Sequence, residues 1–165
     1  MGSRNVGALN TYQQVGAWAG LTVLLVDTAK GVLAVTVPRL VGVDDWALFI
    51  TTPLMVAGHN WPVFLGFRGG KGAATALGVL AAIAWEVALL AALTWLAIAL
   101  IFRYASLASM VSLAAAPFYA VWLADPQRTE LAGFMAILVI LRHHANIRRL
   151  IKGEEPKIGR SAAEK

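Results

Sequence analysis

Residues 86–102 read EVALLAALTWLAIALIF, a run whose one charged side chain, Glu86, stands at its start. About 17 to 25 apolar residues in a helix suffice to cross the hydrocarbon interior of a bilayer. Several such runs follow one another here, which is typical of a helical membrane protein rather than a soluble domain with a leader. We place them at residues 15–41, 46–57, 72–85, 86–102, 106–124 and 129–146. The sequence therefore predicts an all-α, polytopic membrane protein with about six transmembrane helices.

The composition agrees with this class. Of 165 residues, 59% are hydrophobic and 14% are charged, and the mean hydropathy is +0.68. The absence of cysteine excludes disulfides and cysteine-based catalysis. The net charge of +5 is not gathered into a soluble basic face, so we expect an anionic membrane surface and no nucleic acid as partner. We interpret residues 1–165 as one integral-membrane domain with a basic tail, residues 147–165, and leave its oligomeric state open.

Some of these segments are irregular. Segments 46–57 and 72–85 are short, so we expect helices that are tilted, broken or extended into the intervening loop. The apolar run from 72 to 102 is too long for one crossing, and Glu86 is the candidate turn within it. Most Lys and Arg residues fall in the tail and in alternate loops, so the positive-inside rule places residues 1–14, 58–71 and 103–105 and the C-terminus in the cytoplasm.

A glycine-rich basic loop, GHNWPVFLGFRGGKG at residues 58–72, separates two apolar segments. We call it the glycine elbow. Lys71 lies between Gly70 and Gly72, whose missing side chains let a phosphate approach both the ammonium and the backbone N–H groups. The elbow is not a Walker A loop, because Leu65 and Gly72 stand where that motif needs Gly and Ser or Thr. The alternative is a tight interfacial turn whose cations only follow the positive-inside rule.

Two further pairs have helical spacing. Ser106 and Ser109 are three residues apart on one helix face, with Arg103 one step back on the same stripe. These residues could contact an oxyanion, although serines in membrane helices often serve only packing. His143 and Asn146 have the same spacing at the end of the last segment. They could bind a hydroxyl group, with His143 suited to proton transfer.

Other polar residues have simpler interpretations. Asp27 and Lys30 lie within a segment and are expected to neutralise each other as a structural pair. His144 is expected to point to the interface. Because His59, His143 and His144 come without a carboxylate cluster, we expect no metal site. A serine hydrolase is not indicated either, since there is no Gly-x-Ser-x-Gly stretch and no His–Asp pair to activate a serine.

In their order, these stretches resemble the bacterial membrane glycerol-3-phosphate acyltransferases that use acyl-phosphate donors, the PlsY family. The resemblance spans almost the whole chain. It rests on Gly2-Ser3…Asn5-Val6-Gly7-Ala8…Asn10, Asp27…Lys30-Gly31, the glycine elbow continued to Thr75, Arg103-Tyr104-Ala105-Ser106-Leu107 and His143…Asn146-Ile147…Arg149-Leu150…Gly153. Any one of these motifs is weak evidence, but the ordered set is specific.

The resemblance implies transfer of a fatty acyl group from acyl phosphate to the sn-1 hydroxyl of glycerol-3-phosphate, giving lysophosphatidic acid and phosphate without a cofactor. The site would face the cytoplasm from a bacterial-type inner membrane, with the acyl chain between helices beside the membrane lipids. The catalytic residues that it implies are Ser3, Lys71, His143 and Asn146. The substrate-binding residues that it implies are Asn5, Asn10, His59, Arg68, Gly69, Gly70, Gly72, Arg103, Ser106 and Ser109.

The chain also departs from the family pattern. Gln13 stands where the family carries an Arg ligand for the acceptor phosphate, which affects the expected affinity or identity of the acceptor. Ala145 stands where an acidic residue is often found. The family usually has seven helices, with one ahead of the serine motif, so an N-terminally truncated or reduced form is expected. The alternatives are an acyltransferase with another acceptor and a non-catalytic transporter of anions or lipids.

Overall fold

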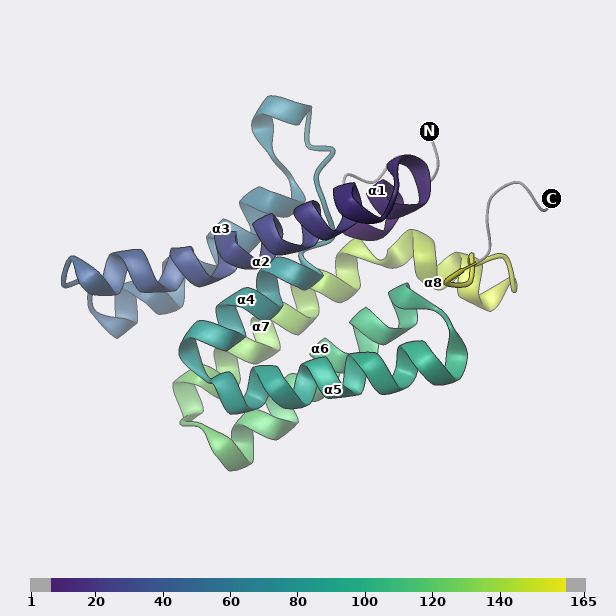
Figure 1. The fold of residues 1–165 in the computed structure, drawn as a ribbon. Helices are drawn as coiled ribbons and strands as arrows, with labels where there is room; N and C mark the ends of the chain where they lie inside the picture. Colours follow the sequence, from purple (N-terminus) through teal and green to yellow (C-terminus); the bar gives the residue numbers. More distant parts are fainter. Residues whose placement is uncertain (1–6, 160–165) are drawn as a thin grey trace.

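The computed structural model describes residues 7–159, and every regular element among them is a helix (Figure 1). The elements are α1 (Ala8–Val15), α2 (Ala17–Leu40), α3 (Asp45–Asn60), the short 3-10 helix η1 (Val63–Leu65), α4 (Ala73–Ile83), α5 (Trp85–Phe102), α6 (Ala105–Leu123), α7 (Pro126–Arg142) and α8 (His144–Ile151). Each of the six expected apolar segments forms a helix, from α2 to α7. The prediction of an all-α chain is therefore confirmed.

The outside of the helical bundle is apolar. Three described helices, α2, α5 and α6, are long and apolar enough to cross a membrane, whereas α4 is apolar but has only 11 residues. Large side chains point outward: Trp18, Phe118 and Trp122 are 83%, 72% and 85% exposed. A soluble protein rarely exposes so much apolar surface, so this belt is the lipid-facing side of a membrane protein.

Several helix ends differ from the predicted ones. Helix α3 continues to Asn60, so the short segment 46–57 is completed by entering the glycine elbow. The long apolar run breaks at Ala84, with φ −155° and ψ 78°, and not at Glu86, which lies in the first turn of α5. A carboxylate is favoured there by the positive N-terminal end of the helix dipole. The last segment breaks at His143, so the prediction that His143 and Asn146 share one continuous helix is wrong.

Helices α2 and α4 cross at two glycines. A Cβ atom built on Gly31 would lie 2.1 Å from the backbone oxygen of Thr75, and one on Gly78 would lie 2.1 Å from that of Thr28. Only residues without a side chain allow the two backbones to approach this closely, as small residues do in other membrane helix pairs. This crossing fixes the start of α4, and with it the end of the glycine elbow, against α2.

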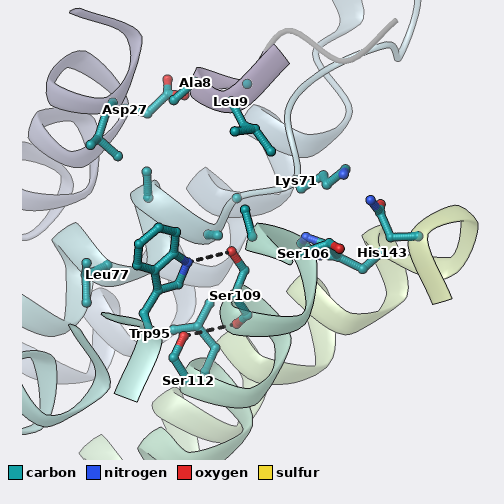
Figure 2. A pocket seen from close by; sticks show the side chains of 18 of the residues that line it. Ala8, Leu9, Asp27, Lys71, Leu77, Trp95, Ser106, Ser109, Ser112 and His143 are labelled. Atoms are coloured by element: carbon teal, nitrogen blue, oxygen red, sulfur yellow. Dashed lines mark hydrogen bonds between the residues drawn. The ribbon is translucent and has the colours of Figure 1, made fainter. Parts of the chain in front are cut away.

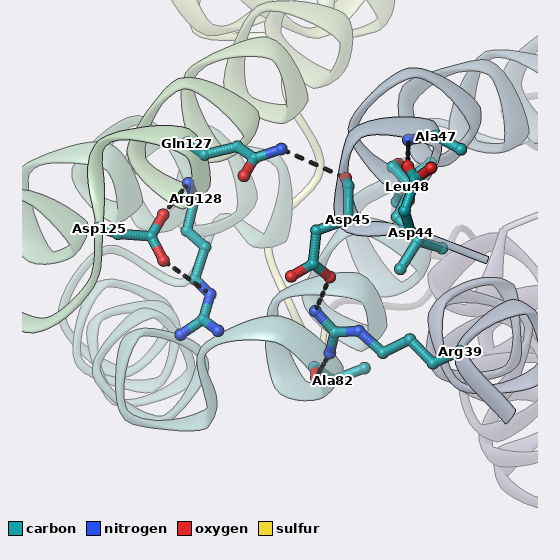
Figure 3. Close-up of polar contacts among 10 residues, drawn as sticks. Arg39, Asp44, Asp45, Ala47, Leu48, Ala82, Asp125, Gln127 and Arg128 are labelled. Atoms are coloured by element: carbon teal, nitrogen blue, oxygen red, sulfur yellow. Dashed lines mark hydrogen bonds and ion pairs between the residues drawn. The ribbon is translucent and has the colours of Figure 1, made fainter. Parts of the chain in front are cut away.

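The starts of α3 and α7 form a polar cluster at the end of the bundle opposite the elbow (Figure 3). Asp44 and Asp125 cap the two helices by accepting hydrogen bonds from the N–H groups of Ala47 and Arg128, each at 2.8 Å. The Gln127 amide donates to the backbone oxygen of Asp45 at 3.2 Å and ties the two helix starts together. In the same cluster Arg39 pairs with Asp45 at 3.1 Å, and Arg128 with Asp125 at 3.2 Å.

Candidate active site

A cavity of about 310 Å³ lies at the elbow end of the bundle (Figure 2). One part of its wall is apolar and is made by Leu9, Leu24, Leu77, Ala91, Ala92, Trp95 and Leu113. The other part carries the polar side chains of Asp27, His59, Lys71, Ser106, Ser109, Ser112, His143, Asn146 and Glu155. The chain thus brings together residues from both ends of its sequence around one space with both apolar and polar lining.

The N-terminus of α4 opens into this cavity. Its cap, Gly72, has φ +77°, a left-handed conformation that glycine adopts freely, and offers no side chain to bind the first N–H groups. A Cβ atom at this position would lie 2.7 Å from Oδ1 of Asn60. Lys71, Gly72, Ala73 and Ala74 line the cavity. Among the described residues no side chain caps these N–H groups, so they and the positive end of the helix dipole favour an anion here.

Lys71 adds a full positive charge to this helix end. Among the described residues its ammonium makes no ion pair, so its charge is available to a ligand. Burial lowers the pKa of Lys71 to about 8, an effect that the charges of Arg149 and Arg142 reinforce and that of Glu155 opposes. The side chain is thus mostly an ammonium at neutral pH and loses its proton in mildly alkaline solution.

His143 lies at the junction of α7 and α8 with its ring buried beside the cavity. Its Nδ1 is 2.8 Å from the backbone oxygen of Val139. A carbonyl oxygen can only accept, so Nδ1 carries the proton and Nε2 is left as an acceptor. Burial lowers the pKa of His143 to about 4, so the ring is neutral at neutral pH.

Ser106 and Asn146 meet at the carboxylate of Glu155. Oε1 of Glu155 accepts from the Ser106 hydroxyl at 2.5 Å and from the Asn146 amide at 2.6 Å, while Oε2 accepts from Nε of Arg149 at 2.7 Å. Asn146 is 4% exposed. Its Oδ1 has no hydrogen-bond partner in the part of the chain that the structure describes. The Glu155 carboxylate thus fixes an amide whose buried Oδ1 is left as an uncommitted acceptor.

Other predicted site residues lie near the cavity in different roles. His59 lines it, with Nδ1 3.7 Å from Oδ1 of Asp27. The predicted Asp27–Lys30 pair is present at 3.1 Å. Ser109 also lines the cavity, but its hydroxyl accepts a hydrogen bond from the Trp95 indole at 3.1 Å (Figure 2).

Several predicted residues do not line the cavity. Gly69 and Gly70 are buried within the elbow, Arg68 is exposed on it, and Asn10 lies in α1. Ser3 and Asn5 fall outside the described residues.

The predicted stripe of Arg103, Ser106 and Ser109 is wrong for Arg103. Helix α6 begins only at Ala105, and Arg103 ends α5 in a left-handed conformation with φ +62°. Its guanidinium donates to the backbone oxygen of Ile158 at 3.0 Å and so binds the tail rather than the cavity.

Comparison with known proteins gives the same family throughout. The family profile described as "Glycerol-3-phosphate acyltransferase" matches residues 1–153. The glycerol-3-phosphate acyltransferase of Vibrio campbellii is 43% identical over 159 residues, which cover 96% of this chain and 78% of that protein. That of Rhodospirillum rubrum is 45% identical over 166 residues, which cover 96% and 77%. This chain belongs to the glycerol-3-phosphate acyltransferase family.

Solved structures of the family share the fold. Crystal structures of PlsY, an integral membrane glycerol 3-phosphate acyltransferase, match with TM-scores of 0.89 for the glycerol 3-phosphate form and 0.88 for the lysophosphatidic acid form. Both are 41% identical to this chain and cover 96% of it, and the matches span 80% and 82% of the two PlsY chains. The resemblance derived from the ordered motifs is thereby confirmed.

Glu155 is a residue of the candidate site that sequence reasoning missed. It stands in a tail that the sequence marks as basic, two positions beyond the residues matched by the family profile. The available signal was a pair of acidic residues, Glu154 and Glu155, that follows a glycine turn: Gly153 has φ +71°, which lets the chain fold back after α8. Charge counting alone hides such a residue, because it treats the tail as a solvated basic segment.

Proposed function

We propose that this membrane acyltransferase transfers an acyl group from acyl phosphate to the sn-1 hydroxyl of glycerol-3-phosphate at the cavity described above. The products are lysophosphatidic acid and inorganic phosphate. One observation carries the proposal: Lys71, which makes no ion pair among the described residues, and the N-terminus of α4 line the same cavity as apolar side chains such as Leu77 and Trp95. Such a cavity suits a substrate pair that combines phosphate groups with a long apolar chain.

Glycerol-3-phosphate would bind at the polar end of the cavity. Lys71 supplies the positive charge for its phosphate, and Ser3 completes this set on the strength of the family resemblance. The uncommitted Oδ1 of Asn146 accepts a hydrogen bond from a substrate hydroxyl, and Nε2 of His143 accepts another. Because both acceptors are fixed by their own hydrogen bonds, they orient the hydroxyl without further loss of side-chain freedom.

Acyl phosphate would bind with its phosphate at the start of α4 and its chain along the apolar wall. The N–H groups from Lys71 to Ala74 surround the phosphate, with Ser106 close by. Ser109 and His59 would line the site beside it, and the remaining elbow residues would support it. The chain would pass Leu77 and Trp95 and leave toward the lipid, which matches the exposed apolar surface of α5.

The reaction needs no protein nucleophile. The sn-1 oxygen forms a bond with the acyl carbon, the bond between that carbon and the phosphate oxygen breaks, and phosphate leaves with the electron pair. The hydroxyl proton passes to the leaving phosphate. An acyl phosphate is already activated, so positioning and stabilisation of the developing negative charge by Lys71 and the α4 amides supply the catalysis.

We place this site at the cytoplasmic face of a bacterial-type plasma membrane. Arg68, Arg148, Lys152 and Lys157 lie at the elbow end or in the tail beside it, whereas the caps Asp44 and Asp125 lie at the opposite end. This distribution follows the positive-inside rule. The cytoplasm is also where a charged, membrane-impermeant acceptor is available to the enzyme.

A single assay tests the activity. The purified chain in liposomes is given acyl phosphate with and without glycerol-3-phosphate, and both lysophosphatidic acid and phosphate are measured. The proposal predicts equal amounts of the two products and no phosphate release without the acceptor. Other polyol phosphates serve as a second arm, because Gln13 replaces the family Arg. Phosphate flux across the liposome membrane without acyl transfer would contradict the proposal and favour a transporter.

A further inference from the structure

The guanidinium of Arg142, the last residue of α7, binds the glycine elbow. Its Nε donates to the backbone oxygen of Gly70 at 3.2 Å, and its Nη2 donates to the backbone oxygens of Gly69 and Gly70 at 3.2 and 3.1 Å. Its Cζ lies 5.2 Å from the ring centroid of Trp61, where the elbow leaves α3. One side chain therefore links the beginning and the end of the elbow to α7.

Backbone geometry connects this contact to the cavity. In a trans peptide unit the C=O and N–H groups point in opposite directions, and the described residues contain no cis peptide bond. When Arg142 binds the Gly70 carbonyl, the N–H group of Lys71 must point away from Arg142. Lys71 lines the cavity and Arg142 does not. The guanidinium therefore sits behind the elbow and faces the carbonyl side of the peptide unit that begins the anion site.

Helix α3 closes the other side of the elbow. The Gly70 N–H donates to the backbone oxygen of His59 at 3.3 Å. A Cβ atom at Gly70 would lie 2.1 Å from Nε2 of His59, and one at Gly69 would lie 2.1 Å from the His59 backbone oxygen. A side chain at position 69 would collide with backbone and one at position 70 would displace the His59 ring, so the elbow lies closely against α3. The contacts of Arg142 then decide where the elbow stands relative to α7.

We propose that Arg142 is a positioning residue for phosphate binding, which orients the elbow so that the Lys71 amide and the start of α4 face the phosphate. Arg142 directly precedes His143 and Gly70 directly precedes Lys71, so the same contact also sets the separation of these two cavity residues. Lysine cannot replace the arginine, because an ammonium lacks the planar fork that bridges two carbonyls and stacks on Trp61. The identity of the phosphate compound as acyl phosphate rests on the proposed function.

Binding of inorganic phosphate tests the positioning without any reaction. The full chain, labelled with ¹⁵N at glycine and lysine, is titrated with phosphate while the amide signals of Gly70 and Lys71 are followed by NMR. The inference predicts that Arg142→Lys weakens phosphate binding by about tenfold or more, the effect of losing a hydrogen bond to a charged group. It also predicts that both amide signals move in this variant before phosphate is added. Arg148→Lys, an exposed arginine on α8, is the matched control and keeps wild-type binding.

Kinetics and thermal unfolding separate positioning from a merely structural role. In Arg142→Lys the KM for acyl phosphate should rise by about tenfold or more, with a smaller fall in kcat and little change in Tm. Wild-type phosphate affinity in Arg142→Lys, or a loss of affinity that only accompanies general unfolding, would overturn the inference. A second variant, Arg142→Gln, also removes the positive charge. If it fails to fold, Arg142→Lys still tests the inference, because lysine keeps that charge. If phosphate binding depends on Arg142 as predicted but the wild-type chain transfers no acyl group, only the proposed function is contradicted.

Discussion

The carboxylate of Glu155 accepts a hydrogen bond from the hydroxyl of Ser106 at 2.5 Å, although the two residues are 49 positions apart in the sequence. The same oxygen accepts from the Asn146 amide at 2.6 Å. The tail of the protein thus returns to the cavity and holds two side chains of the candidate site in place. Ser106 at the start of α6 and Asn146 in α8 are therefore oriented by the same carboxylate, which belongs to neither helix.

Replacing this carboxylate should loosen both helices. Glu155→Gln keeps the size of the side chain but removes the charge and turns one acceptor into a donor, so we expect a stability loss of about 1.5–3 kcal/mol. Acyl transfer should also fall, because Asn146 loses its fixed orientation. Thermal unfolding and kcat/KM measure the two effects. Glu154→Gln, an exposed neighbour, is the control and should leave both quantities unchanged.

The pH dependence of this effect follows from the pKa of Glu155. Burial alone would raise that pKa, but the hydrogen bonds from Ser106, Asn146 and Arg149 outweigh it and hold the pKa below the ordinary value of 4.5. A lowered carboxyl pKa stabilises the folded state above the unfolded pKa, and this contribution is lost as the pH falls through the folded pKa. The difference in Tm between wild type and Glu155→Gln should therefore shrink below pH 4.5. A constant difference down to strongly acidic pH would contradict this explanation.

Lys71 should give acyl transfer an alkaline limit. Its pKa is lowered to about 8, chiefly by burial, and only the ammonium attracts phosphate. The value of kcat/KM for the acceptor reports the free enzyme, so it should decline as the pH rises above about 8. In Lys71→Arg the charge persists, and the decline should move to higher pH even if the rate at neutral pH is lower. An unchanged alkaline limit in Lys71→Arg would assign the titration to another group.

Gln13 offers a gain-of-function test in α1. It lies four residues after Leu9, which lines the cavity, so the two side chains share a helix face. Side chains of a helix lean toward its N-terminus, and the longer arginine would extend toward the cavity from this position. Gln13→Arg should lower the KM for glycerol-3-phosphate several-fold, about the effect of one charge-assisted contact. If KM stays the same while other polyol phosphates react better than glycerol-3-phosphate, Gln13 reflects a different acceptor.

The close crossing of α2 and α4 should tolerate no methyl group. Gly31→Ala places a Cβ against the Thr75 backbone, which cannot move away as a flexible side chain would, so we expect a loss of about 1–3 kcal/mol. Gly133→Ala in α7 is the control, because its Cβ would meet nothing within 4 Å. Thermal unfolding in detergent gives the Tm of both variants for comparison. Equal Tm values would show that the crossing is looser than described.

The helices and much of the cavity could be predicted from sequence because both depend on local signals. Apolar runs such as 86–102 identify a membrane helix by composition alone. The glycines around Lys71 indicate that a ligand such as phosphate can approach the backbone closely. The positive-inside rule then brought four separated stretches to one end of the bundle. The ordered motifs led to the correct family.

The remaining features depend on contacts between distant residues. Arg103 was assigned to the cavity by helical spacing, but the helix had already ended in a left-handed residue, and its guanidinium binds the tail. Arg142 falls within the predicted segment 129–146 and was given no role at the site from sequence, although its guanidinium binds the glycine elbow 72 positions away. The return of the tail to the cavity at Glu155 likewise produces no periodic pattern in the sequence. Long-range polar contacts of this kind are settled by tertiary packing, which single-sequence periodicity does not report.

The central claim is that the cavity around Lys71 carries out acceptor-dependent acyl transfer. The most direct measurement is phosphate release from acyl phosphate, with and without glycerol-3-phosphate, by wild type, Lys71→Ala and the exposed control Lys152→Ala. We expect acceptor-dependent release by wild type and Lys152→Ala, and a loss of about 100-fold or more in Lys71→Ala with its Tm retained. Wild-type release by a folded Lys71→Ala variant would contradict the account.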